Sequence, residues 1–311
     1  MGEKHMNHIT RKNQNSRELL AKSIEKIDGA YAYSTIRAYK ADFIQFIEFC
    51  EERNEGALPT KPLLVVDFIT QLSNGKRSSA SIRRALCGIS TIHKLNRLDD
   101  PGKDPDVALE MRRMHRKLGR SSKQACGINV DALNKLISAT DDSIRGIRDR
   151  ALLLVAYDTL CRRSELVSLQ VKDIKINNKN GIESSSILLR KSKTDQDSTG
   201  KWLHLSSRAH GALIAWMKHL PENQEMLFCG LNRSFDLSPN IGAGQINRIY
   251  KRIARKAGLD ESEIKRISGH SMRVGAAQDL LNSGASMPMI MQRGRWSKTD
   301  TVMRYVEHSN Y

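Results

Sequence analysis

Apolar residues recur every three or four positions along nearly the whole first third of the chain, and this spacing restricts that part to packed helices. Such spacing places apolar side chains on one face of a helix, which is stable only when it is buried. Five stretches of this kind precede residue 119, and Pro62, Ser78 and Pro105 stand at three of their starts, as is typical of helix N-termini. The pattern predicts an all-α bundle over residues 17–118.

The segments on either side of this bundle lack a helical period. Residues 1–16 are polar and aperiodic, and we expect a disordered tail without the apolar core of a signal peptide. Residues 119–127, with two glycines and two serines, are typical of a linker. A length of 311 residues favours two domains. We therefore expect a second domain over residues 128–311.

The second domain mixes helical and β-prone segments. Helical spacing returns at 130–136, 144–160 and 246–257. The runs VKDIKI, SSILLR and KWLHLS are β-prone, and the turn-rich KSKTDQDSTG separates the last two. These patterns predict a mainly α fold with one small antiparallel sheet, in which an α-helical bundle precedes an α+β domain.

The net charge of the chain restricts the classes of partner that it can bind. The 51 lysines and arginines exceed the 34 acidic residues by 17, and the pI is about 9.8. Such a surface attracts polyanions, of which nucleic acid is the commonest, although the charge alone leaves a membrane-surface or ribosomal protein as alternatives. No apolar run approaches the roughly 20 residues of a spanning helix. We expect a cytoplasmic protein that associates with nucleic acid and not with membranes.

Basic residues gather on several predicted helix faces. Between Arg112 and Lys123 there are six basic residues and no acid, spaced along one side of a helix. On the stretch from Ile246 to Ala257, glutamine and arginine lie opposite the apolar positions, and both types can read base edges in a major groove. An ordinary solvated surface is the alternative in each case. The residues expected to contact DNA are Arg37, Lys40, Arg83, Arg84, Arg112, Arg113, Arg116, Gln245, Arg248 and Arg252.

Four separated segments of the second domain carry polar residues that packing does not explain. They are residues 158–166, 190–194, 268–273 and 294–305. Each segment alone is weak evidence for a functional site, since ion pairs, solvated lysines and H-x-x-R matches are common by chance. In this order they resemble the tyrosine recombinase (lambda integrase) family, whose signature is Arg, Lys, H-x-x-R, His or Trp, and a nucleophilic Tyr nine residues later. Trp296 and Tyr305 have that spacing.

The resemblance, which is clear from about Leu152 to Val306, implies an active site. Its L-x-R-x-x-E pattern selects Arg162 over the adjacent Arg163, and Tyr311 lacks the spacing of the nucleophile. The implied catalytic residues are Arg162, Glu165, Lys193, His270, Arg273, Trp296 and the nucleophile Tyr305.

These residue types suit the transfer of a phosphodiester. Two guanidiniums can stabilise the charge on the nonbridging oxygens. A tyrosine has an ordinary pKa of about 10, so Tyr305 needs a positive field or a base, and His270 can act as that base or hold a phosphate oxygen. By the resemblance, Lys193 would protonate the departing 5′-oxygen, Trp296 would donate its indole N–H to the phosphate, and Glu165 would orient a site residue.

The implied reaction is strand transfer through a 3′-phosphotyrosyl link, without a cofactor. We expect neither ATP nor metal to be required, because the sequence has no P-loop, no clustered carboxylates, and five cysteines without a C-x-x-C pair. The implied partner is duplex DNA with inverted half-sites, bound by a dimer on each site and a tetramer in the synapse. A telomere resolvase, a type IB topoisomerase and an idle DNA-binding regulator on the same fold are the alternatives.

One feature departs from the family pattern. Relatives carry a further helix after the nucleophile that docks into a neighbouring subunit, whereas only residues 306–311 follow Tyr305. Either the chain is truncated or its subunits couple through another surface.

Overall fold

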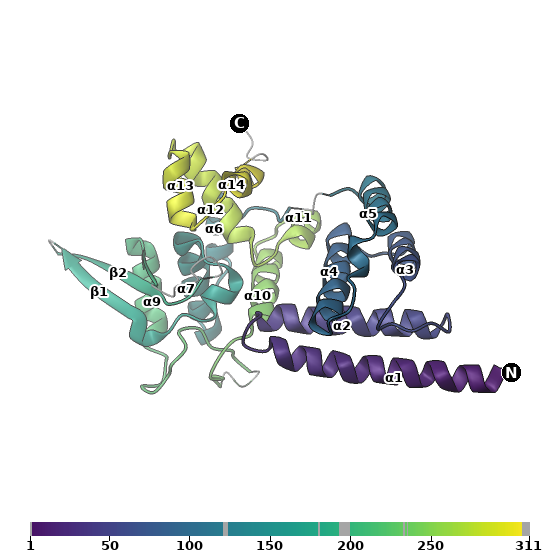
Figure 1. Cartoon of the computed structure of the whole chain (residues 1–311). Helices are drawn as coiled ribbons and strands as arrows, with labels where there is room; N and C mark the ends of the chain where they lie inside the picture. Colours follow the sequence, from purple (N-terminus) through teal and green to yellow (C-terminus); the bar gives the residue numbers. More distant parts are fainter. Residues whose placement is uncertain are drawn as a thin grey trace. The chain divides into compact units, whose positions relative to one another are not determined.

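The computed structural model describes residues 2–120, 124–179, 181–192, 200–232, 234 and 236–306. It divides into two compact units, residues 1–123 and 124–311, and the boundary falls inside the 119–127 segment that was predicted as a linker (Figure 1). Among the residues described, no helix has both the length and the apolar composition needed to cross a membrane.

The first unit is built from helices alone in its described part. These are α1 (Gly2–Ile27), α2 (Tyr33–Glu51), α3 (Pro62–Asn74), α4 (Ser79–Leu95), the short 3-10 helix η1 (Pro101–Lys103) and α5 (Pro105–Leu118). The predicted helix starts are confirmed: Pro62 and Pro105 begin α3 and α5, and Ser78 caps α4 by accepting a hydrogen bond from the Ser81 N–H. The core is aromatic, with the rings of Phe46 and Phe68 packed edge to face at 5.1 Å.

The N-terminal segment was predicted wrongly. Helix α1 begins at Gly2, so it covers residues that were expected to form a disordered tail up to residue 16. Asn13 is fully buried, donates from its amide to the Glu55 carbonyl oxygen and accepts from the Ala57 N–H. Asn13 thus forms hydrogen bonds with the backbone of residues 55 and 57, which are distant in sequence. Local periodicity cannot predict such a contact.

The basic stretch after Arg112 is also shorter as a helix than its charge pattern predicts. Helix α5 ends at Leu118, and Gly119 follows with a φ of 74°. Glycine tolerates this positive φ, which residues with a Cβ rarely adopt, so the helix can end here. Arg120 therefore does not continue the helical face of Arg112 and Arg116, and Lys123 lies outside the described residues.

The second unit combines helices with one small sheet. Its elements are α6 (Val130–Ser138), α7 (Ile144–Thr159), α8 (Arg163–Leu166), η2 (Val171–Asp173), β1 (Ile174–Lys179), β2 (Ile182–Leu189), β3 (Lys201–His204), α9 (Ser207–Met217), α10 (Ala243–Lys256), α11 (Glu261–Arg266), α12 (Ser271–Asn282), α13 (Met287–Gly294) and α14 (Thr299–Val306). The sheet is antiparallel in the order β1-β2-β3, as predicted. Helix α9 packs on α7 and on β2 (Figure 1).

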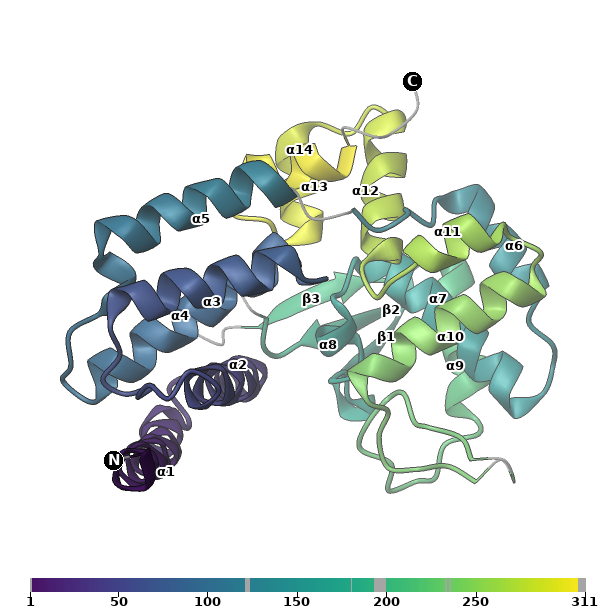
Figure 2. The same ribbon diagram turned by 90° about the vertical axis from the view of Figure 1, so that its right-hand side faces the viewer.

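Helix α7 lies at the centre of this unit. Its residues 151–156 are all buried, which explains why the sequence there is apolar on every face. Helix α12 packs on α7 and also on α13 and α14, and these last three helices lie together in Figure 2. A separate small apolar cluster, which includes Leu160, Ala277, Ile290 and Val302, joins them. The end of α7 and the start of α12 therefore lie close to the C-terminal helices.

Candidate active site

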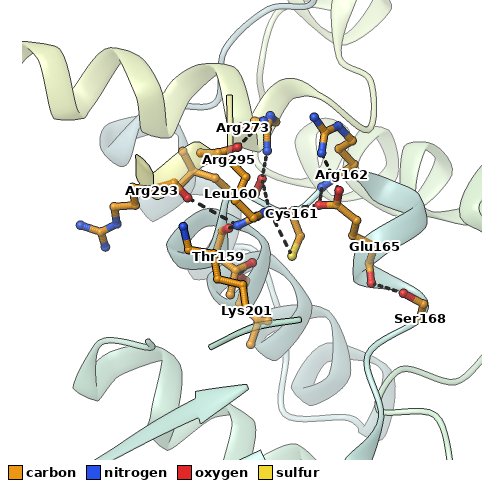
Figure 3. A network of polar contacts seen from close by, with 12 residues as sticks. Thr159, Leu160, Cys161, Arg162, Glu165, Ser168, Lys201, Arg273, Arg293 and Arg295 are labelled. Atoms are coloured by element: carbon orange, nitrogen blue, oxygen red, sulfur yellow. Dashed lines mark hydrogen bonds and ion pairs between the residues drawn. The ribbon is translucent and has the colours of Figure 1, made fainter. Parts of the chain in front are cut away.

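The C-terminal end of α7 is closed by two arginines from later in the chain. Leu160, in a left-handed conformation with a φ of 50°, ends the helix. Its carbonyl oxygen accepts from Nη1 of Arg273 at 2.6 Å and from Nη2 of Arg295 at 3.2 Å, and the Thr159 carbonyl accepts from Nη1 of Arg295 at 2.9 Å (Figure 3). The two guanidiniums thus satisfy the Thr159 and Leu160 carbonyls and interact favourably with the negative end of the helix.

This turn leads directly into Arg162 and Glu165. The Glu165 carboxylate accepts from the Arg162 backbone N–H at 2.9 Å and from Nη1 of Arg162 at 2.6 Å. Glu165 is buried, whereas Arg162 is half-buried and the neighbouring Arg163 is exposed. The carboxylate therefore orients the guanidinium that the sequence pattern selected, and leaves Arg163 outside this contact.

Arg273 is the most deeply buried of these cations, with 1% of its surface exposed. Besides Leu160, its guanidinium contacts the Gly294 carbonyl oxygen, so two backbone oxygens hold it. Burial lowers the pKa of Arg273 to about 10, and the charges of Arg162 and Arg295 act in the same direction. Arg273 still carries its proton at neutral pH, and the site concentrates positive charge where an anion could bind.

Two aromatic side chains continue the site from Arg273. Its guanidinium carbon lies 4.2 Å from the ring centroid of Trp296, and the Trp296 ring lies 5.6 Å from that of Tyr305, tilted by 53°. Trp296 is buried and Tyr305 is half-buried. Gly294 makes this packing possible, because a Cβ at that position would overlap the Trp296 ring.

The backbone of the tyrosine is also held. The carbonyl oxygen of Tyr305 accepts from the side-chain amide of Gln278 on α12 at 3.0 Å and from that of Gln124 at 3.3 Å. Both contacts lie within the second unit. The last turn of α14 is therefore tied to α12 and to the start of the unit.

His270 precedes the first residue of α12, three residues before Arg273. Partial burial lowers the pKa of His270, and the positive charges of Arg273, Arg163 and Arg162 lower it further, while Glu165 raises it. The imidazole is therefore biased towards its neutral form, in which one ring nitrogen can accept a proton.

Five of the seven expected catalytic side chains form two contact groups, Arg162 with Glu165, and Arg273 with Trp296 and Tyr305. The charges of Arg162, Arg273 and Glu165 also act on the pKa of His270. Lys193, the seventh, comes between β2 and β3 in the sequence and lies outside the described residues. Lys201, on β3, instead donates to the Gln292 carbonyl at 3.2 Å.

The residues expected to contact DNA differ in how the protein holds them. Arg84 is bound by both carboxylate oxygens of Asp42, and Arg113 and Arg252 pair with Glu110 and Asp149. The others are exposed on their helices. They are Arg37 and Lys40 on α2, Arg83 on α4, Arg112 and Arg116 on α5, and Gln245 and Arg248 on α10.

Sequence reasoning missed two contributors to the site. Arg295 pairs with Glu165 at 3.0 Å, and Gln278 holds the Tyr305 backbone. The only sequence signal for Arg295 is its place directly before Trp296 in the motif. Gln278 carries none, because the contact depends on how α12 and α14 pack.

Comparison with known proteins identifies the class. The fold, together with a buried arginine, a buried tryptophan and a tyrosine in this order, is that of a tyrosine recombinase. The model of the phage integrase family matches residues 128–311, which is more than half of the chain. The chain belongs to the phage integrase family.

Individual relatives span most of the chain. The integrase/recombinase xerD homolog of Selenomonas ruminantium is 25% identical over 96% of this chain and 88% of its own length. Recombinase cre of Escherichia phage P1 is 27% identical over 84% of this chain and 80% of its own, so this recombinase is Cre-like.

Solved structures share the fold at lower identity. The XerH site-specific recombinase bound to difH substrate has a TM-score of 0.64 at 17% identity, covering 92% of this chain and 79% of its own. The Tn1549 transposon integrase, in complex with a circular intermediate DNA, has a TM-score of 0.64 at 14% identity and covers 95% and 96%.

Proposed function

We propose that this recombinase cuts and rejoins duplex DNA at inverted-repeat sites through a 3′-phosphotyrosyl link to Tyr305. One observation carries the proposal: the Tyr305 ring lies against Trp296, which in turn lies over the Arg273 guanidinium. Tyr305 is the tyrosine at the family's nine-residue spacing, and it belongs to the part of the chain that the family model matches.

The cations prepare the phosphate for attack. Arg162 and Arg273 contact the nonbridging oxygens and stabilise the charge that builds up as phosphorus becomes five-coordinate. Tyr305 Oη then forms a bond to phosphorus and the bond to O5′ breaks. The phenolic proton passes to His270, whose lowered pKa keeps it neutral and able to accept. The indole N–H of Trp296 donates to a phosphate oxygen.

The departing oxygen needs a proton, and Lys193 supplies it. A 5′-phosphorothiolate leaves without a proton, so this substrate should restore cleavage by Lys193→Ala. Failure of the rescue would remove Lys193 from the general-acid role. In the second half of the reaction a 5′-hydroxyl of the partner strand attacks the phosphotyrosine, which releases Tyr305 and needs no added energy source.

The exposed basic faces hold the DNA. Gln245 and Arg248 on α10 are free to reach base edges, while Arg252 is oriented by Asp149. Arg112 and Arg116 on α5, and the cations of α2 and α4, contact phosphates. Two subunits occupy inverted half-sites, and two such dimers form the tetramer in which strands are exchanged.

The test is to trap the covalent intermediate. The wild type and Tyr305→Phe are incubated with DNA fragments from the protein's own genomic neighbourhood, and adducts that resist SDS but not protease are isolated and their ends sequenced. Adducts only with the wild type, at one inverted-repeat position, are expected. Adducts at random positions would instead favour a topoisomerase, and tight binding without any adduct a DNA-binding regulator.

A further inference from the structure

Arg295 is an arginine that the recombinase signature leaves out, although it lies inside the site. Its side chain is 6% exposed and donates to the Thr159 and Leu160 carbonyls, at 2.9 and 3.2 Å, and to the Glu165 carboxylate at 3.0 Å. In Figure 3 Arg295 lies among the site residues, whereas the side chain of Arg293 points away from them.

The backbone conformation of Arg295 also indicates that its side-chain contacts matter. Arg295 follows α13 in the left-handed conformation, with φ 56° and ψ 48°. This conformation is unfavourable for a residue with a Cβ and suits glycine far better. Because the arginine adopts it, its side-chain contacts must offset the conformational cost.

The Glu165 carboxylate is shared between two guanidiniums. Oε1 accepts from Arg162 at 2.6 Å, while Oε2 accepts from the Arg162 backbone at 2.9 Å and from Arg295 at 3.0 Å. Arg295 therefore holds Oε2 of the carboxylate in place. Oε1 accepts from only one N–H of the Arg162 side chain. The remaining donors of Arg162 stay available to a phosphate.

We infer that Arg295 is a positioning residue of the strand-transfer reaction, which anchors Glu165 to the end of α7 so that Glu165 aims Arg162 at the phosphate. This inference rests on the proposed function. Arg295 acts through Glu165, and its side chain takes no direct part in bond breaking or proton transfer.

The charges around Glu165 turn this role into a measurable pH dependence. Burial raises the pKa of Glu165, but the Arg162 N–H, the charge of Arg295 and the pairing with Arg162 together bring it below its ordinary value. The other ionisable groups that interact with Glu165 are His270, Arg273 and Cys161. Without Arg295, one of the charges that lower the pKa of Glu165 is lost, so its pKa rises. Glu165 then takes up a proton at higher pH and releases Arg162.

Arg295→Gly tests the inference without straining the backbone, because glycine adopts the left-handed conformation readily. We expect adduct formation to slow by about tenfold or more while DNA binding is retained. The acid limb of the rate should move to higher pH. Arg295→Lys keeps the charge, so it should return the acid limb towards that of the wild type. Arg293→Ala removes the same charge two residues away and should leave the acid limb in place.

Each failure can be recognised separately. The assay uses the genomic-neighbourhood DNA fragments, with Tyr305→Phe alongside. If the wild type forms no Tyr305-dependent adduct, the proposed function is wrong. If it does, but Arg295→Gly cleaves at the wild-type rate with the wild-type pH profile, Arg295 has no positioning role. A shift that persists when Glu165→Gln is added would equally overturn the inference, because it would not pass through Glu165.

Discussion

The guanidinium of Arg273 lies between two carbonyl oxygens and the face of Trp296, 4.2 Å from the ring centroid. The tryptophan thus covers a buried cation on one side, while its own ring contacts Tyr305 on the other. No acidic side chain pairs with Arg273 in these contacts; carbonyl dipoles and a π face hold its charge, and Glu165 acts on it without a direct contact. A buried cation without a paired carboxylate attracts a phosphate.

Trp296→Phe separates the ring of this tryptophan from its N–H. The phenyl ring still covers Arg273, so we expect an unchanged melting temperature within a few degrees. The lost donor should slow adduct formation by about a hundredfold. Quenched-time-course cleavage and thermal denaturation measure the two effects. Trp202→Phe, on the half-exposed tryptophan of β3, is the control and should cleave normally. An undiminished rate in Trp296→Phe would exclude the indole N–H as a phosphate donor.

Gly294→Ala is expected to damage both stability and cleavage. The added Cβ would overlap the ring of Trp296, which has no room to move because it is buried against Arg273. Overpacking of this kind costs about 1–3 kcal/mol. Urea denaturation of the variant checks this loss.

Gly211→Ala on α9 is the matched comparison for this substitution. A Cβ there meets nothing within 4 Å. Alanine should instead stabilise the helix by up to about 1 kcal/mol. Equal effects of the two substitutions would contradict the packing described for Gly294.

The architecture was largely predictable because it rests on local patterns. Helical periodicity, proline starts and β-prone runs located α2 to α5, α6, α7, α10 and all three strands. Helix α9 was missed, although Ala209, Leu213 and Trp216 give it a buried apolar stripe. Helix α1 was missed over residues 2–16, since Asn13 is buried through contacts with residues 55 and 57, which no local pattern reveals. Most elements with a stripe of apolar residues were therefore located from the sequence, and α9 is the exception.

The site was predictable in its motif residues and not in their supports. The spacing of Trp296 and Tyr305 can be recognised in the sequence because the two residues lie on adjacent segments of the chain. Arg295 reaches Glu165 across 130 residues, and Gln278 reaches the Tyr305 backbone across a helix interface. Such contacts depend on tertiary packing, so sequence spacing cannot encode them.

His270 should give the protein a defined pH response. Its pKa is lowered in the folded state, so the unfolded chain takes up a proton first as the pH falls below about 6.5, the ordinary value for histidine. Its contribution to stability is therefore intact above that pH and is lost as the pH falls towards the folded-state pKa. Cleavage should decline only as the pH approaches the lower folded-state pKa, because protonated His270 cannot accept the Tyr305 proton.

His270→Gln should flatten this dependence. Denaturant titrations between pH 5 and 8 should show less loss of stability on acidification than in the wild type, together with a low rate at every pH. His219→Gln, on an exposed histidine, should keep the wild-type slope. A wild-type slope in His270→Gln would mean that another group is responsible.

Gln278→Leu tests how far the Tyr305 backbone must be held. The change removes a 3.0 Å donor to the Tyr305 carbonyl and leaves only Gln124. We expect adduct formation to fall by about fivefold or more, since small displacements of a nucleophile are costly, with unchanged DNA affinity. Single-turnover cleavage and fluorescence anisotropy measure the two quantities. Gln292→Leu, on an exposed glutamine of α13, should behave as the wild type. If Gln278→Leu cleaves as fast as that control, the contact does not position Tyr305.

Asp149→Ala should be among the most destabilising polar substitutions. Asp149 is 1% exposed, binds the buried Arg148 at 2.6 and 3.0 Å, and pairs with Arg252 on α10. Its removal leaves a buried guanidinium without its counterion, which costs about 3–5 kcal/mol. Lys61→Ala breaks an exposed pair with Glu55 and should cost less than about 1 kcal/mol. Because Asp149 also orients Arg252, the milder Asp149→Asn should weaken DNA binding at a temperature where it remains folded. Unchanged affinity in that variant would remove Arg252 from the DNA interface.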